Sequence, residues 1–171
     1  MPSVPIIALT ATATPKVQGD IQSALHLRSP MISKLSFDRR NLELVIREKS
    51  GNKHLDLQFI VDLYSTAGNA AGSTIIYTMT RKEAEKTCAY LEGKLPGLKV
   101  GCYHAGLAHP IRQQAHRDFV TGQSPIITAT TAFGMGIDKP DIRRVVHWGP
   151  AKTMEEFYQQ VGRAGRDGLK S

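Results

Sequence analysis

Short apolar segments alternate along this chain with amphipathic segments of helical spacing, and this alternation restricts the possible fold more than any other feature. Four of the apolar segments are rich in β-branched or aromatic residues: 75–78, 99–104, 125–129 and 143–148. Strands that alternate with helices favour a parallel sheet with crossover helices. The predicted fold class is therefore α/β, a three-layer domain with a central, mainly parallel sheet flanked by helices.

The predicted helices between these strands have recognisable start signals. Thr80 with Glu83 forms a capping box, and Thr153 with Glu156 forms another before the last helix. A further helix is expected to begin at His109, where a proline follows in the first turn. The sequence therefore places a helix after three of the four strands.

The chain before the first of these strands gives weaker signals. Residues 32–37 and 42–48 have strand-like composition and are predicted as two further strands. Residues 53–65 are predicted as a helix, and the small residues at 66–73 as a mobile loop.

The N-terminal residues do not fit the alternating pattern. An apolar strand is predicted at 5–11, followed by a small-residue loop, a helix and a break at Ser29. This unit has no strand partner of its own kind nearby. We therefore interpret residues 1–28 as the end of a preceding domain and residues 29–171 as a second domain.

The chain is basic, with 22 Lys and Arg residues against 15 Asp and Glu residues. A net charge of +7 favours a polyanionic partner, and most of the excess lies from residue 81 onward. The basic half is also the half that carries the arginine-rich C-terminal motif.

Cysteine and apolar content exclude several classes of protein. Cys88 and Cys102 are too few for a disulfide framework or a four-ligand zinc site. Cys102 and His104 have a spacing that a metal site can use, but without a further ligand cluster we interpret them as buried strand residues. The sequence contains neither an apolar run of membrane-spanning length nor a signal peptide. We expect an intracellular segment in a reducing compartment.

The sequence at 154–168 predicts a helix with one apolar side and one polar, basic side. At about 100° per residue, the aromatic and aliphatic residues form one arc, and Gln159, Arg163 and Arg166 fall together opposite. Two guanidinium groups that face outward suit a multiply charged phosphate. The alternative is a solvated basic face, since the C-terminal end of a helix also favours arginine.

A second candidate segment, at 127–141, runs from a strand into a loop of small residues, glycines and an aspartate. Ligands of open α/β sheets bind at the carboxyl ends of strands, where this loop begins. Its threonines and backbone amides suit strand phosphates, and Asp138 suits a ribose. Turn chemistry explains the glycines equally well. The candidates are Thr128, Thr130, Gly134, Gly136 and Asp138.

The sequence lacks the phosphate-cradling loop G-x-x-x-x-G-K-[ST]. Gly93 and Lys94 are adjacent, but the upstream glycine is missing and Leu95 follows. Without that loop the chain does not hold a triphosphate and its Mg²⁺ by itself. The arginines are therefore predicted to act on a nucleotide held by something else.

Six sequence blocks carry a family resemblance. The blocks are ALTATAT at 8–14, FDRRNL at 37–42, IIY with TRKEAE at 75–85, YHAGL at 103–107, AFGMGIDKPDIR at 132–143 and YQQVGRAGRDG at 158–168. In this order they resemble the second RecA-like domain of RecQ family DNA helicases, within superfamily 2. The stretch NLELVIREKSGN favours the Werner-type branch. DEAD-box RNA helicases are similar in the last block but differ at AFGMGIDKPD.

Two positions depart from the family pattern. Gln160 stands where many relatives have glutamate, and Arg40 stands where many have proline. Neither change is expected to abolish the fold, but both bear on how the two domains pair.

The resemblance implies part of an ATP-dependent DNA helicase that moves 3′ to 5′ and unwinds DNA in repair and recombination. ATP and Mg²⁺ are then held mainly by the preceding RecA-like domain in cis, so this chain alone is expected to be inactive. The implied partners are single-stranded DNA and duplex junctions, with no membrane. The implied location is the nucleus in a eukaryote and the cytoplasm otherwise.

The resemblance also implies roles for single residues. Arg166 is implied as the principal arginine finger, with Arg163 and Gln159 beside it. The cofactor contacts are Asp138, Gly136 and Gly134. The nucleic-acid contacts are Thr130, Thr128, His104 and Thr78. Residues that belong with the first domain are Thr10, Thr12 and Thr14.

Two other functions stay open. One is a nucleic-acid or protein binding module that keeps the fold without working arginine fingers. The other is an RNA helicase relative. ATP turnover separates the first from the leading interpretation, and unwinding of matched DNA and RNA duplexes separates the second.

Overall fold

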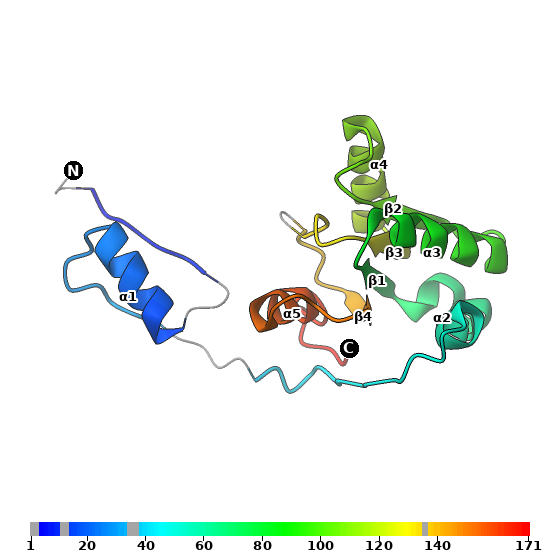
Figure 1. The fold of residues 1–171 in the computed structure, drawn as a ribbon, viewed down its shortest axis with the longest axis horizontal. Coiled ribbons are helices and arrows are strands. Elements are labelled where there is room, and N and C mark those ends of the chain that lie inside the picture. The colour runs from blue at the N-terminus through cyan, green and yellow to red at the C-terminus, as the bar shows by residue number, and fades with distance from the viewer. Residues whose placement is uncertain (1–3, 11–13, 34–37, 135–136) are drawn as a thin grey trace. The chain divides into compact units, whose positions relative to one another are not determined.

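The computed structural model describes residues 4–10, 14–33, 38–134 and 137–171 (Figure 1). Contacts divide the chain into two compact units, Met1–Arg39 and Arg40–Ser171. The sheet and the candidate site lie in the second unit.

The second unit is built on a sheet of parallel strands (Figure 1). The strands are β1 (Ser73–Thr78), β2 (Val100–Tyr103), β3 (Ile126–Ala129) and β4 (Ile142–Trp148). Their order across the sheet is β2-β3-β1-β4, and each pairing is parallel. The strands coincide with the four apolar segments of the sequence, so the predicted parallel sheet is confirmed.

Helices precede or follow the strands as the sequence predicts. The helical elements are α2 (Lys53–Ala67), the short 3-10 helix η1 (Gly68–Ala71), α3 (Arg81–Lys94), α4 (His109–Val120) and α5 (Met154–Val161). The Thr80 hydroxyl accepts a hydrogen bond from the Glu83 N–H at 3.1 Å. The Thr153 hydroxyl accepts from the Glu156 N–H, also at 3.1 Å. These bonds satisfy N–H groups that the helix itself leaves unpaired, which fixes where α3 and α5 begin.

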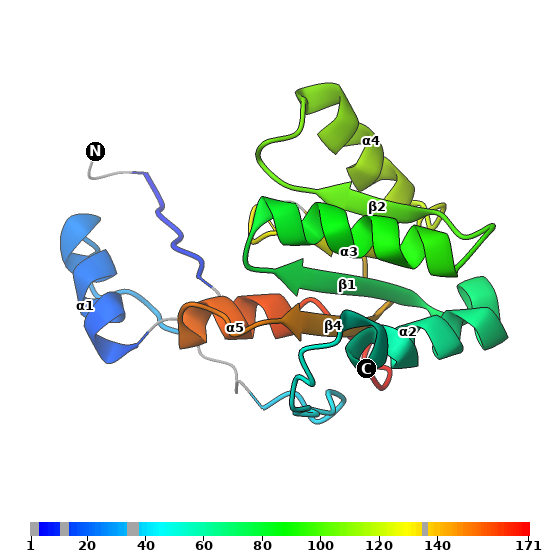
Figure 2. The same ribbon diagram turned by 45° about the vertical axis from the view of Figure 1, so that its right-hand side comes forward.

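Each face of the sheet carries its own hydrophobic cluster, because neighbouring residues of a strand point to opposite faces. On one face Ile76 packs with Leu57 of α2 and Leu91 of α3. On the other face Ile75 packs with Phe119 of α4. In Figure 2, α3 lies in front of the sheet. The unit therefore has three layers, and the predicted fold class is confirmed.

The first unit contains α1 (Pro15–Ala24). The Thr14 hydroxyl caps this helix by accepting from the Val17 N–H at 3.4 Å, and none of the helix residues is buried. Residues 5–10 form no strand, so the strand predicted there is wrong for its described part. Thr12 lies outside the described residues.

The prediction of a strand at 42–48 is also wrong. The segment is extended without strand pairing among the described residues, and Ile46 is 98% exposed. Strand-like composition gives a strand only where a neighbouring strand accepts and donates the ladder bonds. Here the Glu43 N–H donates to the carbonyl of Ser171 at 2.9 Å, but no ladder follows.

Two further segments differ from the sequence predictions. Residues 32–33 form no strand, and the rest of the strand predicted at 32–37 lies outside the described residues. The segment at 66–73 is not a simple loop, because α2 continues to Ala67, η1 follows and β1 begins at Ser73.

The cysteines occupy the elements that the sequence predicts. Cys88 lies in α3 and Cys102 in β2, and both are free thiols. Within the described ranges, no three His, Cys, Asp or Glu side chains gather in a way that suits a metal ion. Among the helices that the structure describes, none combines the length and the apolar character that crossing a membrane requires.

Candidate functional site

The predicted helix at 154–168 ends early. α5 stops at Val161, and residues 162–167 form turns, which we call the arginine loop together with Gly168. Gly165 and Gly168 have φ values of +56° and +82°, a conformation that side chains other than glycine rarely adopt. Placing Arg163 and Arg166 on a helix face was therefore wrong. They lie in the loop beyond α5, whereas Gln159 is exposed on the helix itself.

Backbone and side-chain hydrogen bonds hold the arginine loop against the rest of the unit. The Gly165 N–H donates to the carbonyl of Ile142, the first residue of β4, at 2.9 Å. The side-chain amide of Asn41 donates to the carbonyls of Gly165 and Leu169, both at 2.9 Å. A residue distant in sequence therefore fixes one carbonyl of the arginine loop and one just beyond its end.

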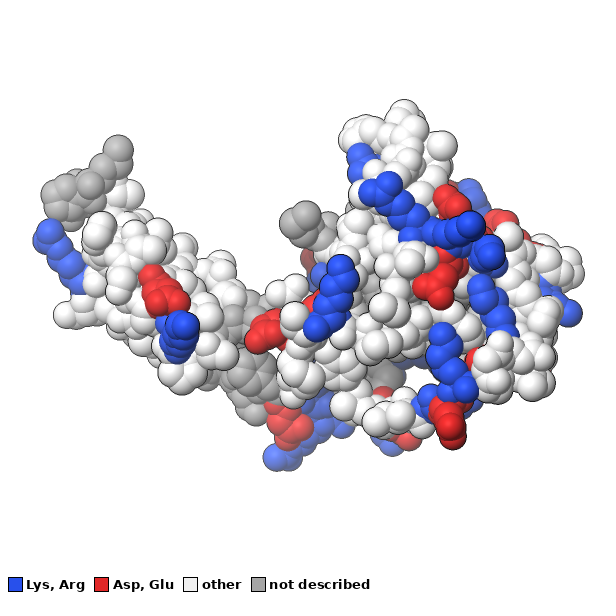
Figure 3. All heavy atoms as spheres, in the orientation of Figure 1, with Lys and Arg blue, Asp and Glu red and all other residues white. Residues whose placement is uncertain are grey.

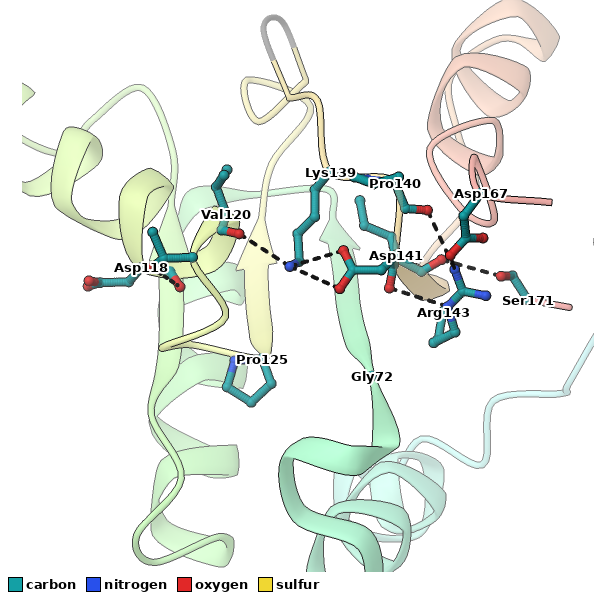
Figure 4. A network of polar contacts seen from close by, with 12 residues as sticks. Gly72, Asp118, Val120, Pro125, Lys139, Pro140, Asp141, Arg143, Asp167 and Ser171 are labelled. Carbon is teal, nitrogen blue, oxygen red and sulfur yellow. Dashed lines mark hydrogen bonds and ion pairs between the residues drawn. The ribbon is translucent and has the colours of Figure 1, made fainter. Parts of the chain in front are cut away.

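An ion pair supports the same loop from β4 (Figure 4). Arg143 pairs with Asp167, and this hydrogen bond holds the pKa of the Asp167 carboxyl below its usual value. The Asp167 N–H donates to the carbonyl of Pro140 at 3.3 Å. The arginine loop is thus tied to the segment that leads into β4.

A buried lysine anchors that leading segment to α4 (Figure 4). Lys139 is 7% exposed, and its ammonium donates to the carbonyl of Val120 at 3.3 Å. The same ammonium pairs with the Asp141 carboxylate at 3.1 Å. A buried ammonium with both an ion partner and a carbonyl acceptor gives a well-defined position to its chain segment.

Arg166 contacts the second candidate segment directly. Its Nη1 donates to the carbonyl of Ile137 at 3.0 Å and lies 3.4 Å from the Asp138 carboxylate. The Arg166 side chain is 36% exposed and that of Asp138 is 94% exposed. Such an exposed ion pair contributes little free energy, so Arg166 remains able to exchange Asp138 for another anion.

Arg163 lies against the glycine of the same segment. A methyl group on Gly134 would come within 2.8 Å of the Arg163 Nη2. The Arg163 side chain is half-buried, and its buried Nε has no hydrogen-bond partner among the described residues. The guanidinium has further donors on its two terminal nitrogens, and these suit the oxygens of an anion.

Tyr77, near the end of β1, contacts the segment before Gly134 and lies beside Arg163 of the arginine loop. Its hydroxyl donates to the carbonyl of Phe133 at 2.8 Å. Burial raises the pKa of Tyr77 to about 12, although the positive charges of Arg163 and Arg166 act in the opposite direction. The phenol therefore stays neutral at physiological pH and keeps its donor role, which fixes the backbone beside Gly134.

Two of the predicted nucleic-acid contacts do not face the surface. Thr128 is fully buried and its hydroxyl donates to the carbonyl of Ala84 at 2.9 Å. Thr78 is 3% exposed and its hydroxyl donates to the carbonyl of Thr80 at 3.1 Å. These side chains connect the sheet to α3 and its preceding turn, so they offer no hydroxyl to a strand.

The other two predicted contacts lie at the same end of the sheet but differ in exposure. Thr130 follows β3 and is half-buried, and its N–H donates to the carbonyl of Tyr103 at 3.2 Å. His104 is 3% exposed; its Nδ1 accepts from the Gly106 N–H at 3.2 Å, and its Nε2 lies 3.0 Å from the Glu85 carboxylate. His104 therefore shapes its own turn, whereas Thr130 remains accessible.

The structure therefore brings together most of the residues that are predicted to contact the nucleotide. Arg163, Arg166, Gly134 and Asp138 form one group, and Gly136 lies outside the described residues. Sequence reasoning missed the contributions of Asn41 and Tyr77, although both stand in the family blocks FDRRNL and IIY. Their roles depend on contacts with residues far along the chain, which local patterns do not reveal.

The group has the chemistry of an anion site. It combines two guanidinium groups, one with an unsatisfied donor, with a loop that starts at a strand end. The residues fit the phosphates of a nucleotide such as ATP, because guanidinium donors match phosphate oxygens. No trio of potential metal ligands gathers in the described part of the chain.

Known proteins of similar sequence carry helicase names. The family described as "Helicase conserved C-terminal domain" matches residues 56–168. The chain is 47% identical to "Bifunctional 3'-5' exonuclease/ATP-dependent helicase WRN" of Mus musculus, over 100% of the chain and 12% of that protein. It is 43% identical to "ATP-dependent DNA helicase RecQ" of Bacillus subtilis, over 97% of the chain and 27% of that protein. The RecQ resemblance predicted from the six blocks is confirmed.

The chain spans less than a third of the length of either relative. Among solved structures, "S. cerevisiae Dbp5 L327V bound to RNA and ADP BeF3" is similar with a TM-score of 0.70. This match covers 95% of the chain and 42% of that protein at 22% identity, so it supports the fold alone.

Proposed function

Since the chain belongs to the family of helicase conserved C-terminal domains, we propose that it is the second RecA-like domain of a RecQ-type ATP-dependent DNA helicase. In this proposal the chain does not hold ATP by itself. Arg163 and Arg166 reach across to the phosphates of a nucleotide bound on a partner domain, the preceding RecA-like domain in cis.

The observation that carries the proposal is the state of Arg163. Its Nε is buried without a partner among the described residues, while Gly134 leaves room for its guanidinium. A buried, unsatisfied cationic donor costs free energy in the isolated chain, typically about 1–3 kcal/mol or more. A phosphate oxygen that approaches from another domain accepts a charge-assisted hydrogen bond from the terminal nitrogens of this half-buried guanidinium.

The two arginines have different supports and so different roles. Arg163 is confined between Tyr77 and Gly134, which suits a fixed donor. Arg166 is more exposed and pairs with Asp138, which suits a side chain that changes partners when the domains close. A guanidinium supplied across an interface typically raises phosphoryl-transfer rates about 10³ to 10⁵-fold by stabilising charge in the transition state. We assign that role to Arg166, with Arg163 beside it and Gln159 lining the same cleft.

Hydrolysis of ATP supplies the free energy for the cycle of domain closure and opening. We assign the Mg²⁺ that accompanies ATP to the partner domain. This chain contributes the two guanidinium groups and a rigid platform of hydrogen bonds beneath them. Thr130, accessible at the end of β3, is the proposed contact to a DNA strand. Closure and opening of the domains then moves the protein 3′ to 5′ along single-stranded DNA. A nuclear location in a eukaryote, and a cytoplasmic one otherwise, follows from the same proposal.

The test uses the protein in which this chain is joined to its nucleotide-binding partner domain. Arg166→Ala is expected to lower DNA-stimulated ATP hydrolysis by about 10³-fold or more. Lys170→Ala is the matched control, because it removes an exposed positive charge four residues away and is expected to hydrolyse ATP at the unmodified rate. Unchanged hydrolysis in the Arg166 variant would leave only a binding module. Equal unwinding of matched DNA and RNA duplexes would remove the assignment to DNA.

A further inference from the structure

The two cysteines of the chain meet between α3 and β2, the strand at one edge of the described sheet. Cys88 of α3 belongs to the hydrophobic cluster on one face of the sheet, and Cys102 of β2 packs against that cluster. The Cys88 Sγ lies 3.5 Å from the carbonyl oxygen of Val100. Val100 and Cys102 are two residues apart in β2, so their side chains point to the same face.

Contacts on both sides of Cys102 hold α3 against β2. Two residues after Cys102, the Nε2 of His104 lies 3.0 Å from the Glu85 carboxylate of α3. Two residues before it, Val100 contacts Cys88. Cys102 therefore lies between two positions at which β2 is attached to α3.

The neighbouring strand β3 supports the same arrangement. Thr128 is the partner of Cys102 in the parallel register, and its hydroxyl donates to the carbonyl of Ala84 at 2.9 Å. Ala84 lies about one helical turn before Cys88 in α3. The fold thus fixes the backbone of both cysteines and brings their thiols into hydrogen-bonding contact.

The two thiols differ in exposure and in acidity. Cys88 is 7% exposed, whereas Cys102 is half-buried. The hydrogen bond with Cys88 lowers the pKa of Cys102, and the same bond, together with burial, raises the pKa of Cys88. Cys102 is therefore the thiol that ionises more readily, and the thiolate is the form that reacts with oxidants.

Charges of both signs surround the pair. In opposition to the hydrogen bond with Cys88, burial and the carboxylates of Glu85 and Glu92 act to raise the pKa of Cys102. On the face shown in Figure 3, blue Lys and Arg side chains continue from α4 onto α3, with single acidic side chains between them. Basic side chains favour the thiolate form of a nearby cysteine. The net direction for Cys102 is a lowered pKa.

We propose that Cys88 and Cys102 are an oxidation site that forms a reversible disulfide with hydrogen peroxide, Cys102 reacting first. The Cys102 thiolate attacks one peroxide oxygen: an S–O bond forms, the O–O bond breaks, and the leaving hydroxide takes a proton to become water. Cys88 then gives up its proton and attacks the Cys102 sulfur: the S–S bond forms, the S–O bond breaks, and a second water leaves. The sulfurs are oxidised and the peroxide oxygens are reduced.

The position of Cys88 explains why the product is a disulfide. A sulfenic acid that meets no second thiol proceeds to sulfinic and sulfonic acids, which are irreversible in most proteins. Cys88 lies where it captures the sulfenic acid of Cys102 before that step. The site lies on the face of the sheet opposite to the cluster that contains Phe133 and Ala164, the latter in the arginine loop. The proposal therefore goes beyond the proposed function and does not depend on it.

The test treats the 171-residue chain, whose sequence has no other cysteine, with hydrogen peroxide and measures free thiols and intact mass. The unmodified chain is expected to lose both thiols and the mass of two hydrogen atoms, to remain a monomer in non-reducing electrophoresis, and to recover with dithiothreitol. Cys88→Ala is expected to gain oxygen at Cys102 instead. Cys102→Ala is the matched control. It keeps one thiol, but a buried one with no second cysteine beside it, and is expected to react at least about tenfold more slowly than Cys88→Ala.

Gain of oxygen by the unmodified chain without loss of hydrogen would overturn the proposal. Disulfide-linked dimers as the main product would also overturn it, because the reacting thiols would then belong to different chains. Equal oxidation rates of the two variants would overturn the order in which the cysteines react. The unmodified chain gives the deciding mass, so the test stands if a variant does not fold.

Discussion

A methyl group at Gly134 is expected to impair ATP hydrolysis without unfolding the domain. The backbone of Gly134 does not require a positive φ, so alanine fits the local conformation. The new Cβ would lie 2.8 Å from the Arg163 Nη2, whereas ordinary contacts are 3.4–4 Å. Its next contacts, at 3.5 Å to Arg163 Cζ and to the carbonyl of Thr131, are ordinary. The guanidinium is therefore the group that must move.

The magnitude follows from these distances. The guanidinium must retreat by at least about 0.6 Å, which a flexible side chain does at a cost of about 0.5–1.5 kcal/mol. A displacement of this order in a positioned catalytic group lowers turnover by about 10 to 100-fold. The midpoint of thermal unfolding should fall by no more than about 2–5 °C. The substitution therefore separates the position of Arg163 from the stability of the fold.

The assay compares Gly134→Ala with Gly93→Ala in the protein that includes the partner domain. Gly93 lies in α3 and has nothing within 4 Å of an added Cβ. Its replacement is expected to leave turnover unchanged and to stabilise the helix by up to about 1 kcal/mol. DNA-stimulated hydrolysis and thermal unfolding are measured for both variants. Wild-type turnover in Gly134→Ala, or a loss of stability large enough to explain the loss of turnover, would refute the reasoning.

Three further substitutions test the supports of the fold and the site. Asn41→Ala removes the hydrogen bonds to the carbonyls of Gly165, in the arginine loop, and Leu169, just beyond it, and is expected to lower the free energy of unfolding by about 1–3 kcal/mol; an unchanged midpoint in thermal or urea unfolding would contradict a stabilising role of these bonds. Tyr64→Phe leaves the carbonyl of Gly72 without its phenol donor and is expected to lower the unfolding midpoint by several degrees, whereas no change would show that this carbonyl finds another partner. Burial lowers the pKa of His147 below its ordinary 6.5, so the folded protein binds fewer protons there and loses stability as the pH falls below about 6.5. His147→Gln should reduce that loss between about pH 7 and pH 5, and identical pH profiles would exclude the contribution.

Most strands and helices of the fold can be predicted from the sequence because their signals are local. Thr80 and Thr153 precede regular helical patterns, and each strand is an apolar run that packs on both faces of the sheet. Periodicity and capping chemistry depend only on neighbouring residues, so they can be recognised without knowledge of the tertiary structure. The segment at 42–48 failed for the opposite reason, since a strand also needs a partner, and composition alone does not show whether one is present.

The candidate site can be predicted from the sequence only in part. Arg163 and Arg166 were identified, but on a helix that in fact ends at Val161, because the glycines that follow favour turns over a continued helix. Thr128 was assigned to the surface although its strand is buried on both faces and its hydroxyl is used internally. Asn41 acts across more than a hundred residues of sequence, and only the folded chain brings it to the arginine loop.

The central claim is that the arginines of this chain act on ATP held by another domain. The most direct measurement is steady-state ATP hydrolysis by the 171-residue chain alone, compared with the same chain joined to its partner domain, both with single-stranded DNA present. The proposal predicts no turnover above background for the chain alone and DNA-stimulated turnover for the joined protein. Hydrolysis by the chain alone at about 1 s⁻¹ or faster, a rate typical of enzymes, would contradict it.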